Sequence, residues 1–173
     1  MTFEYLYEST PHSSCKNRKD GEEGEIMHEQ KIDSTHKLIE GFKAFYQDVK
    51  NPQLHKINEI YSENVWFKDP VHELYGSEAL HTYLSEMCLN VQSGRFEYLD
   101  QILSEDTAYI KWNMHFKHPK LGKNTVTVRG VSQIQFNDRI YFHEDIYDMG
   151  ELIYEHVPVL GSVVKKLKKR LAA

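Results

Sequence analysis

The hydrophobic pattern of this chain changes period near Gly94, and this change limits the folds available to it. Before it, apolar residues recur at helical spacings, as in Leu38, Phe42 and Phe45. After it, apolar and polar residues alternate over a long segment, which predicts a strand. The apolar positions of that segment are Ala108, Ile110, Trp112, Met114 and Phe116. Helices followed by such strands predict an α+β domain, with three N-terminal helices packed on a curved antiparallel sheet.

Local signals give the expected order of elements. Capping candidates at 33–35 open a first helix that runs to about residue 50. Asn51-Pro52 starts a second helix, whose buried stripe we expect at Leu54, Ile57, Ile60 and Tyr61. A strand at 65–68 ends at Asp69-Pro70, because Pro cannot donate to a ladder. Ser77 is expected to cap a third helix, and two strands at 125–136 and 140–147 complete the sheet.

Composition divides the chain into three parts. Residues 1–30 are polar, charged and without period, which predicts a disordered tail. Residues 31–150 carry the folded domain, and residues 151–173 form a helical extension. The 173 residues suit one domain with an ordinary core.

Charge and cysteine content limit the classes of binding partner and the cellular compartments to be expected for this chain. A net charge of -5 gives no reason to expect a nucleic-acid partner. The two cysteines, Cys15 and Cys88, do not suggest a disulfide framework, and no secretory signal is evident. We therefore expect a cytoplasmic protein.

Two carboxylates stand out as acid–base candidates. Asp69 follows an apolar strand, where a carboxylate accepts a proton more readily than in water; the other interpretation is an ordinary Asp-Pro turn. His143 and Asp145 lie two residues apart on a strand, so both side chains are expected to point to the face that also carries Tyr141 and Tyr147. They form either an acid–base pair or a buried polar pair that orders the strand.

Other residues are candidates for the lining of the site. His72 follows Asp69 by three residues and either reaches the same mouth or is solvated. Tyr46, Trp112 and Met114 line either the core or the apolar end of a pocket. The four polar residues at 69, 72, 143 and 145 have no established metal-ligand spacing, so we predict no metal site.

Two motifs resemble the SnoaL-like branch of the nuclear transport factor 2-like superfamily over about residues 33–148. "FKDPVHELYG" is similar to the strand-end segment of ketosteroid isomerases, in which the Asp before Pro shuttles the proton; Asp69 matches it. "RIYFHEDIYD" is similar to the last strand of SnoaL-like cyclases, and Asp145 matches their pocket carboxylate. Where the isomerases carry oxyanion donors, this chain has Phe45, with Tyr46 one residue later, and Ser132.

The resemblance implies a cone-shaped, cystatin-like fold whose pocket takes a small hydrophobic molecule. It implies a cofactor-independent isomerase, cyclase or hydratase in which Asp69, His143 and Asp145 are catalytic. The ligand-binding residues would be Tyr46, His72, Trp112, Met114, Ser132 and Tyr147. A ligand-binding or scaffold domain without catalysis is the alternative. The resemblance also implies a homodimer that joins through the outer face of the sheet.

The C-terminal extension reads as a basic amphipathic helix. Its apolar side is expected at Leu160, Val163, Val164, Leu167 and Leu171. Its other side carries Lys165, Lys166, Lys168, Lys169 and Arg170. We expect the apolar side to pack on the domain or on a partner subunit; contact with an anionic membrane surface is the open alternative.

Overall fold

The computed structural model describes residues 16–121, 124–150, 152 and 160–171. The chain divides into two compact units, residues 1–36 and residues 37–173. Helix α1 (Lys16–Tyr46) begins well before the expected start near Asp33. Residues 1–15 of the expected tail lie outside the described residues, and disorder in the remainder of that tail stays a prediction.

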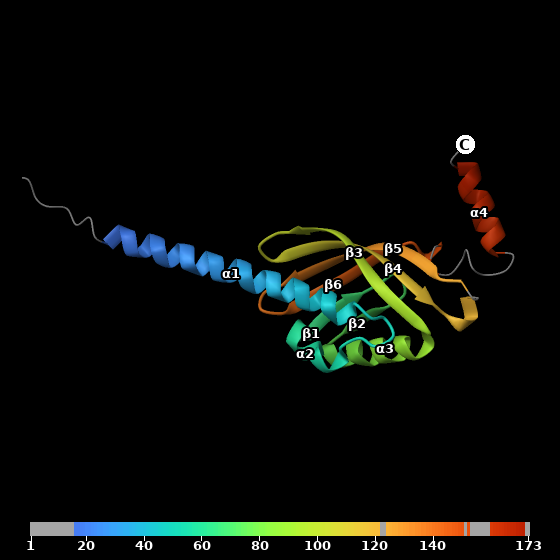
Figure 1. The fold of residues 1–173 in the computed structure, drawn as a ribbon, viewed down its shortest axis with the longest axis horizontal. Coiled ribbons are helices and arrows are strands. Elements are labelled where there is room, and N and C mark those ends of the chain that lie inside the picture. Colours follow the sequence, from blue (N-terminus) through green and yellow to red (C-terminus); the bar gives the residue numbers. More distant parts are fainter. Residues whose placement is uncertain (1–15, 122–123, 151, 153–159, 172–173) are drawn as a thin grey trace, which may run out of the picture. The chain divides into compact units, whose positions relative to one another are not determined.

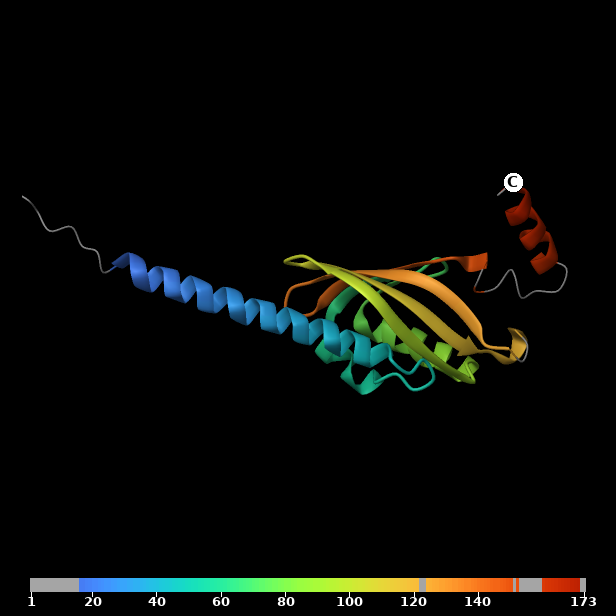
Figure 2. The ribbon, with the colours of Figure 1, turned by 45° about the horizontal axis from the view of Figure 1, so that its top comes forward.

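The second unit is built around a six-stranded sheet. Its strands are β1 (Tyr61–Lys68), β2 (Glu73–Tyr75), β3 (Ser93–Leu103), β4 (Thr107–Lys117), β5 (Val126–Phe136) and β6 (Ile140–Tyr147). Their spatial order is β2-β1-β6-β5-β4-β3. Neighbours pair antiparallel except β1 and β6, which run parallel, so the expected fully antiparallel sheet is corrected at this pair. The sheet curves over its helices without closing, as Figures 1 and 2 show.

Short helices cover the concave face of the sheet. A 3₁₀ turn, η1 (Leu54–Lys56), leads into α2 (Ile57–Ile60), and α3 (Ser77–Asn90) follows β2. The predicted cap at Ser77 is wrong: Gly76, at φ 91°, is the N-cap, and Ser77 is the first helical residue. The predicted helix start at Asn51-Pro52 is wrong as well, since η1 begins after Gln53. Another 3₁₀ turn, η2 (Pro119–Leu121), joins β4 to the loop before β5.

The core lies between these helices and the inner face of the sheet. The predicted apolar stripe of α1 is confirmed, because Leu38, Phe42 and Phe45 are buried. The predicted alternation in β4 is also confirmed: Ala108, Ile110 and Trp112 are buried, whereas Tyr109 and Lys111 between them are exposed. Inward-pointing side chains of the central strands therefore meet the end of α1, and the polar groups described below lie in this region.

Helix α4 (Leu160–Leu171) is the C-terminal element. Its Lys168 Nζ lies 2.9 Å from Asp148 Oδ2. Of the expected apolar side, Val163, Leu167 and Leu171 are 49%, 54% and 88% exposed, whereas Val164 is half-buried. None of the helices in the described part of the chain combines the length and the apolar character needed to cross a bilayer.

Candidate functional site

Three polar side chains of β5 and β6 meet on the inner face of the sheet. Ser132 and Asp145 are register partners, and Ser132 Oγ donates to Asp145 Oδ1 at 2.5 Å. His143 Nε2 lies 3.0 Å from the same carboxylate oxygen. His143 and Ser132 are buried, whereas the Asp145 side chain is 20% exposed. Asp145 Oδ1 is therefore hydrogen-bonded to two buried side chains, His143 and Ser132.

Further hydrogen bonds extend this group in two directions. Trp112 Nε1 on β4 donates to Ser132 Oγ at 2.9 Å. On the other side, the hydroxyl of Tyr61 on β1 lies 2.8 Å from His143 Nδ1. The hydroxyls of Tyr46 and Tyr61 are 2.7 Å apart. We call the resulting chain the polar relay; its members are Tyr46, Tyr61, His143, Asp145, Ser132 and Trp112.

The direction of the polar relay follows for an ionised Asp145 carboxylate and a neutral His143 ring. An ionised carboxylate only accepts hydrogen bonds, so His143 Nε2 carries the hydrogen that faces Asp145. In the neutral ring Nδ1 is then an acceptor, and Tyr61 donates to it. Tyr46 in turn donates to Tyr61. Both arms of the relay therefore donate toward Asp145, which is the final acceptor.

Two polar atoms at this end of the polar relay, Asp145 Oδ2 and the Tyr147 hydroxyl oxygen, can still form hydrogen bonds. Within the described residues, Asp145 Oδ2 accepts no hydrogen bond, and the hydroxyl of Tyr147 has no partner. The two residues are two positions apart on β6, so their side chains leave the strand on the same face. An open acceptor and an open donor are thus side by side.

Four buried or half-buried tyrosines lie close enough to Asp145 to be affected by its charge. Burial raises the pKa of Tyr46, Tyr61, Tyr98 and Tyr147 above the ordinary value of a phenol, and the negative charge of Asp145 raises each pKa further. A phenol with a raised pKa stays protonated at neutral pH. These hydroxyls therefore remain hydrogen-bond donors around the carboxylate.

Asp69 has a different environment at the end of β1. Its Oδ1 accepts from the backbone N–H groups of Val71 and His72, both at 2.7 Å. Its Oδ2 accepts from the Tyr83 hydroxyl at 2.6 Å, and the side chain is only 3% exposed. His72 Nδ1 approaches both oxygens at 3.3 Å, and the His72 side chain is 44% exposed. The carboxylate holds the turn that Asp-Pro chemistry predicts, and it ties this turn to α3.

The Asp69 turn and the polar relay are close neighbours. The ring of Phe67 lies 5.6 Å from that of Tyr83 and 5.1 Å from that of His143, measured between centroids. Tyr147 connects them electrostatically, because its pKa is raised first by burial and then by the charges of both Asp69 and Asp145. A common cavity for the two carboxylates stays a prediction.

Sequence reasoning did not identify Tyr61 and Tyr83 as part of this region. It assigned Tyr61 to the buried side of the second helix, whereas β1 begins at this residue. Tyr83 lies on α3, 14 residues after Asp69, and local spacing does not connect the two. The available signal was that both tyrosines stand among apolar residues, where a buried hydroxyl needs a polar partner.

Apolar side chains complete the surroundings of the relay. The indole of Trp112 lies edge-on to the ring of Phe96, at 5.1 Å, and 6.3 Å from that of Tyr147. Met114, two residues further along β4, is half-buried and packs in the same cluster. At Gly130, opposite Trp112 in the β4–β5 register, an added Cβ would lie 2.2 Å from the indole. Glycine is therefore needed for this close approach.

A groove in the described part of the chain is lined by residues other than those of the polar relay and the Asp69 turn. It has a volume of about 440 Å³ and is lined by residues of 47–51 and 92–95. None of the predicted site residues contributes to it. The described residues also contain no group of three or more His, Cys, Asp or Glu placed to hold a metal ion.

Comparison with known protein families agrees with this arrangement of strands and helices. The SnoaL-like domain family matches residues 42–143, which include strands β1 to β5, the first half of β6 and every member of the polar relay except Asp145. The chain belongs to the SnoaL-like domain family. No match is found among curated protein sequences.

Solved structures share the fold of this SnoaL-like chain. A hypothetical protein of Catenulispora acidiphila with a ketosteroid isomerase-like fold, in complex with trimethylamine, has a TM-score of 0.59 at 8% identity; the match covers 67% of this chain and 88% of that protein. A protein of Shewanella denitrificans described as a SnoaL-like polyketide cyclase has a TM-score of 0.59 at 16% identity, with coverages of 68% and 92%. An LEH-like epoxide hydrolase of M. tuberculosis has a TM-score of 0.58 at 13% identity, with coverages of 75% and 94%. At these identities the likeness shows the fold alone.

Proposed function

We propose that this SnoaL-like domain is a cofactor-independent enzyme that moves a proton on a small hydrophobic carbonyl or ring compound. The observation that supports this proposal best is the state of Asp145. One of its oxygens is held by His143 and Ser132, and the other is open among the described residues. A carboxylate fixed in this way has a defined orientation and one free acceptor, as a general base requires.

The proposed reaction is an isomerisation through an enol or enolate. Asp145 Oδ2 removes a proton from the carbon next to the carbonyl, and the electron pair moves onto the carbonyl oxygen. The open hydroxyl of Tyr147 donates to that oxygen as its negative charge grows. The carboxylic acid then returns the proton to another carbon of the same conjugated system. Atoms and electrons balance without a cofactor.

The rest of the polar relay would hold Asp145 in place. His143 orients the carboxylate, and Tyr61, which is itself bonded to Tyr46, holds the His143 ring through Nδ1. We assign these three as positioning residues, because their hydrogen-bond partners among the described residues are one another and Asp145. The apolar side chains of Trp112 and Met114 fit a flat, hydrophobic substrate.

Asp69 remains a second candidate for the base. The resemblance favours it, but its oxygens are already engaged by two backbone N–H groups and Tyr83. To accept a proton, Asp69 would have to weaken one of these bonds. We therefore place the proton transfer at Asp145 and assign Asp69 the role of fixing the turn beside the site.

The test uses β,γ-unsaturated cyclic ketones of increasing size as probes, because their conjugated products are followed by ultraviolet absorbance. We expect turnover of at least one probe, and a loss of at least about a hundredfold in kcat for Asp145→Asn. Asp138→Asn removes an exposed carboxylate in the turn before β6 and serves as the matched control. Full turnover by a folded Asp145→Asn variant would place the base elsewhere.

One observation favours the alternative, a domain that binds a small molecule without catalysis. At the positions where the resemblance implies oxyanion donors, Phe45 has no donor and Ser132 already donates to Asp145. This alternative predicts that the same ketones bind without conversion. Measurable binding by calorimetry with no product over long incubation would support it against the enzyme.

A further inference from the structure

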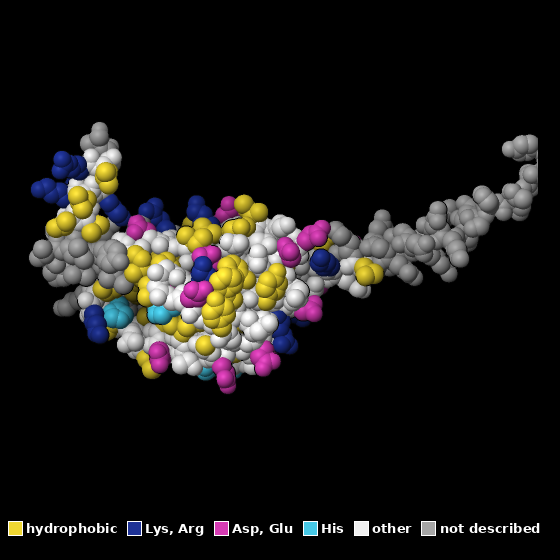
Figure 3. Space-filling model, turned by 180° about the vertical axis from the view of Figure 1, so that it is seen from behind, with side chains coloured by type: hydrophobic (Ala, Val, Ile, Leu, Met, Phe, Trp, Pro, Cys, Tyr) yellow, Lys and Arg dark blue, Asp and Glu magenta, His cyan; other side chains and the backbone are white. Residues whose placement is uncertain are grey.

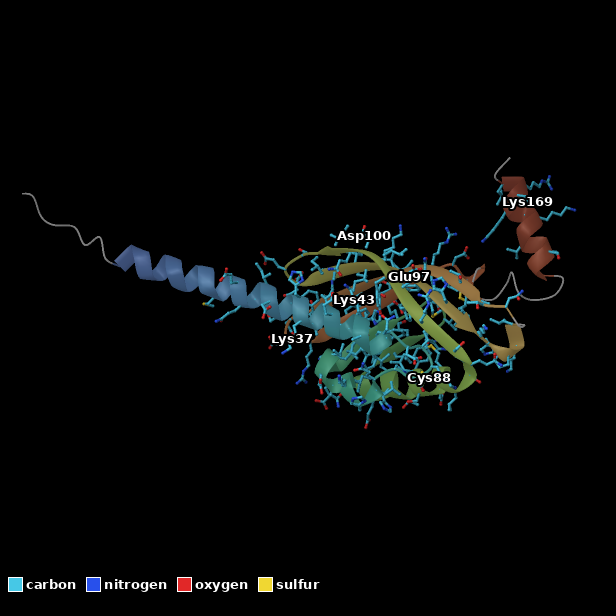
Figure 4. The ribbon with its side chains drawn as sticks, viewed as in Figure 1. Lys37, Lys43, Cys88, Glu97, Asp100 and Lys169 are labelled. Carbon is cyan, nitrogen blue, oxygen red and sulfur yellow. The ribbon has the colours of Figure 1, made fainter. Side chains whose placement is uncertain are left out.

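The C-terminal helix α4 has exposed side chains of two opposite kinds. Val163, Leu167 and Leu171 recur every four residues, so they form one apolar stripe along the helix. All three are exposed, from about half to nearly complete exposure. Lys166, Lys169 and Arg170 are exposed as well. Figure 3 shows both kinds of side chain on α4, and Lys169 projects away from the helix in Figure 4.

Helix α4 and the rest of the chain carry net charges of opposite sign. Residues 160–171 contain five of the 21 basic residues and no acidic residue, so they carry a charge of +5. The remaining residues carry 16 basic and 26 acidic side chains, a charge of -10. Such an asymmetry indicates that the helix and the domain meet different partners.

We propose that α4 lies on the surface of a bilayer that contains anionic phospholipids. A bilayer interface offers an apolar layer for the stripe and negative headgroups for the cations at the same time. At 12 residues, the helix fits along an interface but is too short to cross it. The proposal goes beyond the chemistry proposed for the relay and does not depend on it.

Other partners would interact favourably with either the apolar stripe or the cations, but not with both. A nucleic acid would engage the cations and leave the aliphatic stripe in water. Packing on the protein would bury the stripe, but it would leave the exposed cations Lys166, Lys169 and Arg170 in water. An anionic bilayer would bury the stripe and pair with the cations at the same time.

The stripe is tested with the full chain and vesicles of phosphatidylcholine, alone or mixed with phosphatidylglycerol. We expect co-sedimentation with the mixed vesicles, weaker at high salt because exposed charges are screened. The double variant Leu167→Gln/Leu171→Gln should lose this binding and keep its melting temperature. Its matched control, Leu89→Gln/Ile102→Gln, removes two exposed aliphatic side chains of α3 and β3 and should bind as before.

The cations are tested in the same assay. Each basic residue near an anionic surface contributes about fivefold to binding, so Lys166→Gln/Lys169→Gln should bind roughly 25-fold more weakly. The control Lys111→Gln/Lys117→Gln removes two exposed cations of β4 and should bind normally.

Three results would overturn the proposal. The first is equal binding, or none, to the neutral and the anionic vesicles. The second is a lower melting temperature for Leu167→Gln/Leu171→Gln with unchanged vesicle binding, which would mean that the stripe packs on protein. The third is binding to duplex DNA, without vesicle binding, that disappears in Lys166→Gln/Lys169→Gln.

Discussion

The close approach of Trp112 to Gly130 makes Gly130→Ala a sharp test of the packing beside the polar relay. The new Cβ would lie 2.2, 2.4 and 2.7 Å from three atoms of the indole, whereas ordinary contacts fall at 3.4–4 Å. The ring must therefore retreat by about 1 Å or more. It has little room to do so, because Trp112 is buried against Phe96 and is held by its hydrogen bond to Ser132.

We expect this substitution to lower the free energy of unfolding by about 1–3 kcal/mol, the usual cost of overpacking a core. For a chain of this size that corresponds to a melting temperature lower by about 2–4 °C for each kcal/mol. Thermal unfolding followed by circular dichroism measures the change. Gly41→Ala is the control: its Cβ meets only the flexible end of Ile60, at 3.0 Å, and Ala is the better helix former.

A double-mutant cycle separates this clash from a general effect of alanine. The clashing atoms belong to the six-membered ring of the indole, and the shorter side chain of Phe does not extend that far. Trp112→Phe alone should destabilise the chain through lost packing and the lost bond to Ser132. Combined with Gly130→Ala it should cost about 1 kcal/mol less than the sum of the two. Wild-type stability for Gly130→Ala, or simple additivity, would refute the reasoning.

Three further predictions follow from the structure. Asp69→Asn should lower the melting temperature and leave kcat for any ketone probe within about tenfold, because Asp69 fixes a turn; unchanged stability with lost turnover would make it the base. Burial raises the pKa of Tyr46 and Tyr61, so the unfolded chain loses these phenolic protons first and the free energy of unfolding should fall as pH rises above about 10. Phenolate absorbance should then rise together with unfolding, and full titration of an intact fold would contradict this. The chain should dimerise through the outer face of the sheet, where Tyr109 and Ile146 are exposed. Light scattering should show that Ile146→Glu weakens this dimer. A wild-type monomer at tens of micromolar protein, roughly the range of weak dimers, would contradict the prediction.

Local periodicity was enough to predict the elements with a long regular pattern. The stripe of α1 and the alternation of β4 are each read directly from the sequence, because burial on one face imposes a fixed period. Strand β2 has three residues and is too short to show a period. In β3 the register shifts between Tyr98 and Asp100, so the inward side changes parity within the strand. The parallel pairing of β1 with β6 depends on contacts about 80 residues apart, which no local pattern contains.

The candidate site was predictable where strand parity and the family resemblance agree. His143 and Asp145 follow from their two-residue spacing on β6, and Ser132 lies opposite Asp145 in the register. Tyr61 was missed because the boundary between α2 and β1 decides which way its side chain points. Nor could the sequence indicate that Asp69 is enclosed by its own turn while Asp145 keeps an open oxygen. That difference arises from side chains and backbone groups brought together only by the fold.

The most direct test of the proposed function is a crystal structure of the chain with a bound naphthol, whose ring and hydroxyl copy the enol form of a cyclic ketone. The proposal predicts that the naphthol oxygen lies within hydrogen-bonding distance of Tyr147 Oη or Asp145 Oδ2. The ring should then rest against Trp112 and Met114. Naphthol bound only in the groove of residues 47–51 and 92–95, with the space beside Asp145 filled by protein side chains, would contradict the proposed site.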